Sequence, residues 1–153
     1  MKTLTGFTLI ELMLTVALIG IILTVALPNY QGIMKQSARA TAQADLMAFA
    51  AAMERHKAAV YTYAGAARAA GDTGSPRVFQ AHSPATETVA LKEYDLTIES
   101  LTGNGLSYTL AATPVPGGTL AKDGVLYLFS DGRKAWDKNN NGTLELTEYC
   151  WRC

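Results

Sequence analysis

The first part of the chain is a long run of apolar residues. Between Phe7 and Leu27 only one residue, Glu11, carries a charge. At a rise of ~1.5 Å per residue, a helix over this run spans roughly 31 Å, about the thickness of the hydrocarbon core of a bilayer. A helix that is apolar all round is seldom a core helix at the very N-terminus of a small protein. The pattern therefore predicts a membrane-spanning helix.

The pattern changes at Pro28, which removes one helical hydrogen bond and predicts either a kink or a restart of the helix. Residues 30–62 are rich in good helix formers, with polar side chains such as Arg39 and Gln43 on some faces. One mostly apolar stripe recurs at spacings of three and four, made of Leu46, Phe49, Ala50, Met53, Lys57 and Val60. We predict one long helix, with residues 7–29 in the membrane and residues 30–62 as the amphipathic helix of a globular head.

The head continues through residues 63–153. A loop-like segment, 65–89, is followed by runs in which apolar and polar residues alternate, the pattern of half-buried strands. The predicted strands are 94–98, 106–112, 125–129 and a short 134–136, with a turn at Gly103-Asn104-Gly105. We expect an α+β fold in which a three- or four-stranded antiparallel sheet covers the apolar stripe of the helix.

Composition excludes several classes of function. The 153 residues contain 13 Lys and Arg against 13 Asp and Glu, with no basic run. General nucleic-acid binding is therefore not expected, because phosphate affinity comes mainly from clustered cations. The chain has no nucleophile elbow, phosphate loop or HExxH motif, so we do not expect an enzyme.

Glu11 is the unusual residue of the apolar run. A carboxylate costs roughly 2.5 to 3.5 kcal/mol at a bilayer centre and less near the interface. No Lys, Arg or His occurs between Phe7 and Tyr30. A cut after Gly6 would create a charged amine at Phe7, one turn away from Glu11 in the same chain and equally available to a neighbouring subunit. The alternative is a carboxylate at the interface that accepts water or is protonated by burial.

The segment Gly6-Phe7-Thr8-Leu9-Ile10-Glu11-Leu12 and its apolar continuation resemble the type IV pilin family with its class III leader peptide. The resemblance implies that a prepilin peptidase removes residues 1–6 by cutting after Gly6 and N-methylates Phe7. It further implies that Glu11 pairs with the Phe7 amine of an adjacent subunit, so that the helix becomes part of a filament core. Phe7, Glu11 and Pro28 are then the residues on which assembly depends.

Later segments, among them 42–47, 53–56, 61–65, 94–98 and 108–114, are similar to minor pilins of the PilE type. This resemblance implies other major and minor pilin subunits and the inner-membrane pilus assembly machinery as partners. Lys2 favours a cytoplasmic N-terminus. We therefore expect a single-pass inner-membrane protein before assembly and an extracellular pilus subunit afterwards. The pilus role, whether adhesion, twitching motility or DNA uptake, stays open.

Two alternatives to a pilus subunit follow from the same residues. The first is a pseudopilin of a type II secretion system, in which a calcium-binding loop would be equally at home. The second belongs to another class, a membrane-tethered calcium-binding module that never polymerises.

The C-terminal part of the head carries a motif for Ca²⁺. Residues 137–148 fit the loop pattern D-x-[DN]-x-[DN]-G-x5-E at every specified place. The expected ligands are side-chain oxygens at positions one, three and five, a backbone carbonyl at seven, a direct or water-mediated contact at nine and a bidentate carboxylate at twelve: Asp137, Asn139, Asn141, Thr143, Glu145 and Glu148. The simpler interpretation is an Asn- and Gly-rich turn. We expect a bound cation to order this loop against the sheet.

The chain has two cysteines, Cys150 and Cys153, at its end. Outside the cytoplasm they can oxidise, and with no other cysteine present they bridge each other or a second chain. A redox motif would be expected at the start of a helix after a strand, and a metal site would need two more ligands. We therefore expect a structural disulfide, although pilins commonly close a longer loop.

Overall fold

The structure is a computed structural model that describes residues 7–152, with the backbone alone for residues 25–29. The predicted leader, its cleavage at Gly6 and the partner cysteine Cys153 lie outside the described residues. The chain divides into two compact units, one ending at Gln36 and one beginning at Ser37. We describe each unit by itself.

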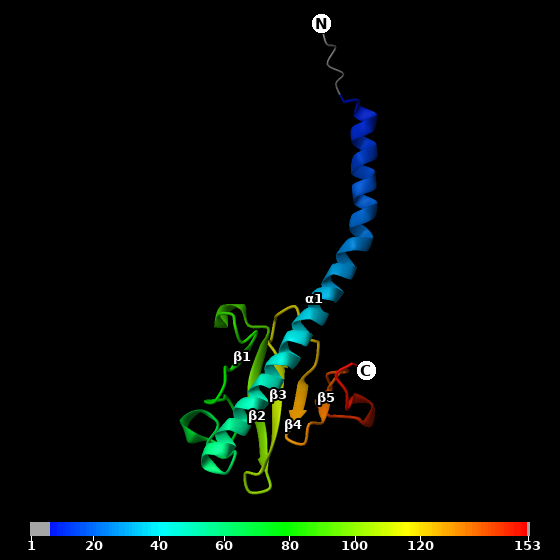
Figure 1. Cartoon of the computed structure of the whole chain (residues 1–153). Helices are drawn as coiled ribbons and strands as arrows, with labels where there is room; N and C mark the ends of the chain where they lie inside the picture. The colour runs from blue at the N-terminus through cyan, green and yellow to red at the C-terminus, as the bar shows by residue number, and fades with distance from the viewer. Residues whose placement is uncertain (1–6, 153) are drawn as a thin grey trace. The chain divides into compact units, whose positions relative to one another are not determined.

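The first unit contains the N-terminal part of helix α1, which runs from Leu9 to Val60 (Figure 1). The backbone stays helical through Pro28, so the helix does not restart there. The large apolar side chains described before Pro28 are exposed, with Leu9 and Ile10 each at 76%. No helix in the described part of the chain is both long and apolar enough to cross a membrane.

The second unit is an antiparallel sheet with the remainder of α1. Its strands lie in chain order, each paired antiparallel with the next: β1 His82–Ser83, β2 Tyr94–Thr102, β3 Ser107–Pro114, β4 Leu126–Phe129 and β5 Lys134–Trp136 (Figure 1). Three short 3₁₀ turns, Arg68–Ala70, Val89–Leu91 and Leu146–Glu148, stand in the connections. The predicted α+β fold is confirmed. The sheet has five strands instead of three or four, because the two residues of β1 are too few to show an alternating pattern.

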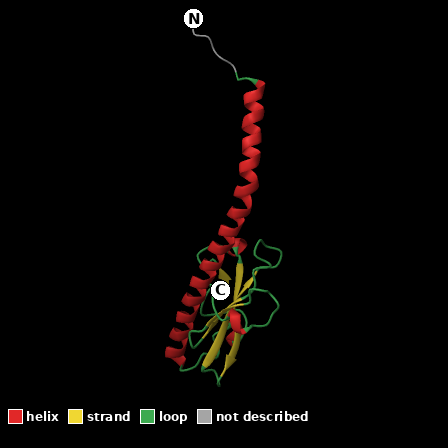
Figure 2. Cartoon of the chain, turned by 90° about the vertical axis from the view of Figure 1, so that its right-hand side faces the viewer, coloured by secondary structure: helices red, strands yellow, loops and turns green. Residues whose placement is uncertain are grey.

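The core of the head forms where one face of the sheet meets the residues of α1 that follow Gln36 (Figure 2). Leu46, Phe49 and Met53 of the predicted stripe are fully buried, and Leu96 and Leu110 meet them from the sheet. Each such side chain stabilises the fold by roughly 1.5 to 3 kcal/mol relative to exposure. The stripe also differs from the prediction at its two ends: Ala38 and Ala42 extend it, whereas Val60 is exposed.

Near the C-terminal end of α1, two tyrosine hydroxyl groups bond to the carboxylate of Glu54. The Tyr63 hydroxyl donates to Glu54 Oε1 at 2.7 Å, and the Tyr108 hydroxyl donates to the same oxygen at 3.4 Å. The two rings meet edge to face, with centroids 4.7 Å apart. Burial, together with the Glu54 carboxylate, raises the pKa of Tyr63 to about 12 and also raises the pKa of Tyr108.

Because of these two tyrosines, the head is expected to lose stability at alkaline pH. A raised pKa means that the folded state holds the phenol proton more tightly than the unfolded state, whose tyrosine titrates near pH 10. The stabilisation is therefore complete below pH 10 and is lost as pH rises towards 12. We expect the phenolate absorbance of Tyr63 and Tyr108 to appear together with loss of the circular dichroism of the fold. Ionisation of Tyr63 or Tyr108 in a fully folded head, identified by the absorbance that Tyr63→Phe and Tyr108→Phe variants lack, would contradict this prediction.

Candidate functional site

Glu11 closes a hydrogen-bonded cap at the start of α1. Its Oε2 accepts from Thr8 N at 3.0 Å and from Thr8 Oγ1 at 2.8 Å, while Glu11 N donates to Thr8 Oγ1 at 3.4 Å. This reciprocal pair is a capping box, in which residues three apart satisfy the free N–H groups of the first turn. The sequence signal for this cap is Thr8-x-x-Glu11, which the charge of Glu11 obscures.

The cap gives the Glu11 carboxylate a hydrogen-bond partner within its own chain. Within one chain Glu11 already has a local partner, Thr8, and the Phe7 amine is exposed by cleavage alone. The structure contains no second subunit, so the pairing of Glu11 with a neighbouring Phe7 stays a prediction. Phe7 itself is 84% exposed, and the side chain of Pro28 is outside the description.

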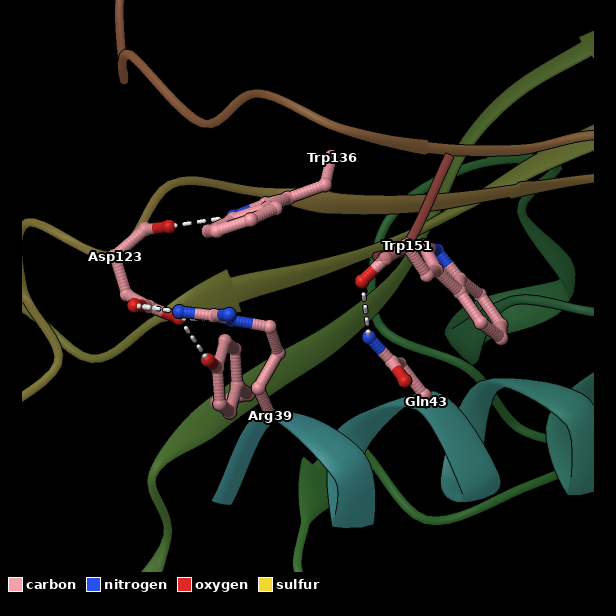
Figure 3. A network of polar contacts seen from close by, with 6 residues as sticks. Arg39, Gln43, Asp123, Trp136 and Trp151 are labelled. Carbon is pink, nitrogen blue, oxygen red and sulfur yellow. Dashed lines mark hydrogen bonds and ion pairs between the residues drawn. The ribbon is translucent and has the colours of Figure 1, made fainter. Parts of the chain in front are cut away.

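In the head, a partly buried ion pair joins the helix to the loop between β3 and β4. Arg39 donates to both carboxylate oxygens of Asp123, at 2.9 Å and 2.6 Å, and the Tyr94 hydroxyl donates to Asp123 Oδ2 at 2.9 Å (Figure 3). Trp136 Nε1 donates to the Asp123 carbonyl at 2.6 Å, and the Arg39 guanidinium lies over the Trp136 ring. The Asp123 carboxylate raises the pKa of Arg39, and burial, followed by Asp123, raises the pKa of Tyr94.

The same region holds the C-terminal segment in place. Gln43 on α1 donates to the Trp151 carbonyl at 3.3 Å (Figure 3). The Trp151 indole donates to the Tyr127 carbonyl of β4 at 3.1 Å, and Lys134 lies over the Trp151 ring. Arg39 and Gln43, which the sequence placed on polar faces of the helix, are thus contacts to the rest of the head. They were missed as such because their partners lie 84 and 108 residues away in sequence.

The predicted calcium loop follows β5 directly. Asp137 is 1% exposed, and its two carboxylate oxygens accept from Asn141 N at 3.1 Å and Gly142 N at 2.9 Å. Asn141 Oδ1 accepts from the N–H and the hydroxyl of Thr143, each at 2.8 Å. Gly142 adopts a left-handed φ of 79°, which permits the sharp turn at loop position six.

The end of the loop folds back onto its beginning. Glu148, 5% exposed, accepts from Asn139 N at 3.3 Å and from Glu145 N at 3.1 Å. The Glu145 carboxylate accepts from the side-chain amides of Asn139 at 3.3 Å and Asn141 at 3.5 Å. The predicted ligands therefore lie together in one hydrogen-bonded loop. Among the described residues, however, no group of three or more His, Cys, Asp or Glu side chains is placed to hold a metal ion.

Of the two cysteines, Cys150 is among the described residues and Cys153 is not. Cys150, after the last 3₁₀ turn, is not a free cysteine. Because Cys153 lies outside the described residues, its pairing with Cys150 stays a prediction.

A capped N-terminal helix whose later part covers an antiparallel sheet, with the C-terminal segment fastened to both, is the architecture of a pilin. Residues 1–27 match the prokaryotic N-terminal methylation motif. Residues 28–124 match the family described as type IV minor pilin ComP, DNA uptake sequence receptor. The chain belongs to this family of type IV minor pilins. No solved structure matches it.

The family assignment confirms the predicted pilin resemblance and its class III leader. It also identifies the chain as a structural protein of the type IV pilus class. Anchoring in the membrane before assembly and contact with other pilins and the pilus machinery follow from a leader of this kind.

Proposed function

We propose that the chain is cut after Gly6, N-methylated at Phe7 and assembled through its N-terminal helix into a type IV pilus. The observation that supports this most is the match of residues 1–27 to the methylation motif, whose residues from Leu9 onward lie in α1. In the assembled filament Glu11 pairs with the Phe7 amine of an adjacent subunit, and the exposed apolar side chains of the first unit pack among those of other pilins. The anchor holds the subunit in the inner membrane before assembly.

A strain lacking the chain separates this proposal from the type II secretion alternative. We expect sheared surface fractions to contain the wild-type chain, and its deletion to change piliation or pilus function while protein secretion continues. Loss of secretion with normal pili would support the pseudopilin instead. Failure to find the chain in any filament would support the tethered module that does not polymerise.

A second proposed function is binding of duplex DNA by the head. The description of the family, a DNA uptake sequence receptor, supports it, because the match covers residues 28–124 of the chain. The balanced charge of the sequence argued against general nucleic-acid binding. The two statements are compatible if the cations are concentrated at one place on the head. Fluorescence anisotropy of a labelled duplex at 50 mM salt tests this function, and absence of binding would contradict it.

We also propose that the loop 137–148 binds Ca²⁺. Its support is the motif together with the buried carboxylates of Asp137 and Glu148, whose charges a cation would neutralise. The backbone N–H groups that now bond to Asp137 at positions five and six shape the loop around that carboxylate. Ordering this loop would fix the C-terminal segment, which we propose to be closed by the Cys150–Cys153 disulfide.

Calcium is then expected to stabilise the head. With a dissociation constant of roughly 0.1 to 1 mM, 5 mM calcium adds about 1 to 2 kcal/mol and raises the melting temperature by roughly 3 to 10 °C. The measurement is thermal denaturation of residues 31–153 with and without calcium, combined with titration calorimetry. Glu148→Gln should abolish the shift, whereas Glu87→Gln, an exposed residue outside the loop, should keep it. No heat and no shift in the wild type would contradict calcium binding.

A further inference from the structure

An open cleft lies in the connection between α1 and β1. It has a volume of about 740 Å³ and is lined by Arg68, Ala69, Pro76, Arg77, Val78, Phe79 and Gln80. This volume is within the range of ligand sites, roughly 300 to 1,000 Å³. The lining contains two guanidinium groups and a side-chain amide but no carboxylate, although the chain as a whole has no net charge. The cleft is thus a local concentration of positive charge.

The two arginines differ in how they are held. Arg77 Nη2 donates to the Gly65 carbonyl at 3.0 Å, which orients the guanidinium and leaves its other donors available. Within the described residues the guanidinium of Arg68 has no hydrogen bond or ion pair, and Arg68 is exposed. Asp72, the acid nearest in sequence to Arg68, accepts instead from Gly65 N at 3.0 Å. Among the described residues, neither arginine forms an ion pair with a carboxylate.

The backbone beneath the arginines is fixed. Arg68 N donates to the Ser75 carbonyl and Arg77 N to the Ala66 carbonyl, both at 2.9 Å, so the two segments run antiparallel on either side of an Ala67–Pro76 bridge. After Arg68 the chain bends sharply, because Ala69 and Ala70 both adopt left-handed φ angles of 54° and 56°. Positive φ is uncommon for residues other than glycine, so two such alanines in succession mark a shape imposed by the surrounding bonds.

The floor of the cleft is anchored to the core of the head. The Phe79 ring stacks on Phe49 of α1, with centroids 5.5 Å apart and planes 9° apart, and Pro76 is buried. The cleft therefore presents its charged groups from a rigid base. A preorganised site of this kind loses little conformational freedom on binding.

We propose that this cleft binds the DNA backbone, with Arg68 and Arg77 each donating to one phosphate group. Guanidinium groups suit phosphate oxygens because their planar donors can bind them in pairs. The inference rests on the DNA binding proposed above and assigns it to a place on the head. Arg68, whose guanidinium has no partner in the described part of the chain, is the principal contact, and Arg77 is the second.

The test uses the full chain in detergent and a fluorescein-labelled 20-base-pair duplex, with anisotropy measured from 50 to 200 mM salt. Each phosphate contact contributes roughly 0.9 to the slope of log affinity against log salt. Arg68→Gln with Arg77→Gln should reduce the slope by about 1.8 and weaken binding at least tenfold at 50 mM salt. Lys122→Gln removes a charge from the exposed loop between β3 and β4. It should change the slope and the affinity by less than half as much as the double variant does. Inorganic phosphate at 10 mM, at matched ionic strength, should compete with the duplex.

The outcomes separate this inference from the function on which it rests. If the wild type binds the duplex and the double variant binds with the same affinity and the same slope, the cleft is not the phosphate site, and DNA binding stands without it. If the wild type does not bind the duplex, the DNA function itself fails. The single variant Arg68→Gln is the control for loss of structure. It breaks no bond within the described head, whereas replacing Arg77 removes its bond to Gly65. It should keep the wild-type melting temperature and still lower the slope by about 0.9.

Discussion

Glu11→Ala is expected to remove the chain from pili while leaving it in the membrane. Alanine in place of a carboxylate makes insertion of the apolar helix more favourable, by roughly 2.5 to 3.5 kcal/mol at a bilayer centre. Assembly is expected to suffer, because the amine of a neighbouring Phe7 would be left without its counter-charge in a medium of low polarity. We expect at least a tenfold loss from sheared pili at unchanged membrane abundance, measured by immunoblotting of both fractions.

The capping box provides the matched control for this prediction. Thr8→Ala removes the hydroxyl that bonds to Glu11 but keeps the carboxylate. If Glu11 acts between subunits, Thr8→Ala changes incorporation less than twofold. If Glu11 acts only by capping its own helix, the two variants should fail alike, and normal incorporation of Glu11→Ala would remove the pairing argument altogether.

Gly124→Ala is expected to prevent folding of the head or to destabilise it by more than about 4 kcal/mol. Gly124 has a left-handed φ of 79°, and a Cβ atom there would overlap the Asp137 carbonyl oxygen. The contact is with backbone, so a side-chain rotation cannot relieve it. Displacing Asp137, the first residue of the proposed calcium loop, would also separate β5 from Asp123. Urea denaturation of residues 31–153, followed by circular dichroism, measures the effect.

Gly117→Ala isolates the effect of the close contact from the effect of backbone conformation. Gly117 has nearly the same φ, 78°, but nothing lies within 4 Å of a Cβ atom placed there. Only the cost of left-handed alanine applies, about 1 to 2 kcal/mol. Equal destabilisation by the two variants would show that the contact of Gly124 with Asp137 does not matter.

Much of the fold was predictable from the sequence because the helix and the longer strands each have a local period of apolar residues. The stripe of Leu46, Phe49 and Met53 marked the buried face of the helix, and alternation marked β2 and β3. Contacts between distant residues were not predictable. Nothing local to Arg39 indicates Asp123, and β1 consists of two residues whose pairing with β2 appears only once the chain is folded.

The candidate sites also divide into those made of contiguous residues, which the sequence predicts, and those formed only by folding. The motif at 137–148 and the leader around Gly6 and Phe7 are each contiguous in sequence, so the sequence alone is enough to predict them. Arg68 and Arg77 were not singled out, because the cleft that contains them depends on two antiparallel loop segments inside a stretch without periodicity. The cap at Thr8 and Glu11 was missed for another reason: the charge of Glu11 obscured a local signal.

Mass spectrometry of the chain recovered from sheared pili decides whether it is processed and assembled. We expect a protein that begins at Phe7, carries a methyl group on its N-terminal amine and is present in purified filaments. A chain that retains residues 1–6, or one that is processed but absent from filaments, would contradict its function as an assembled minor pilin.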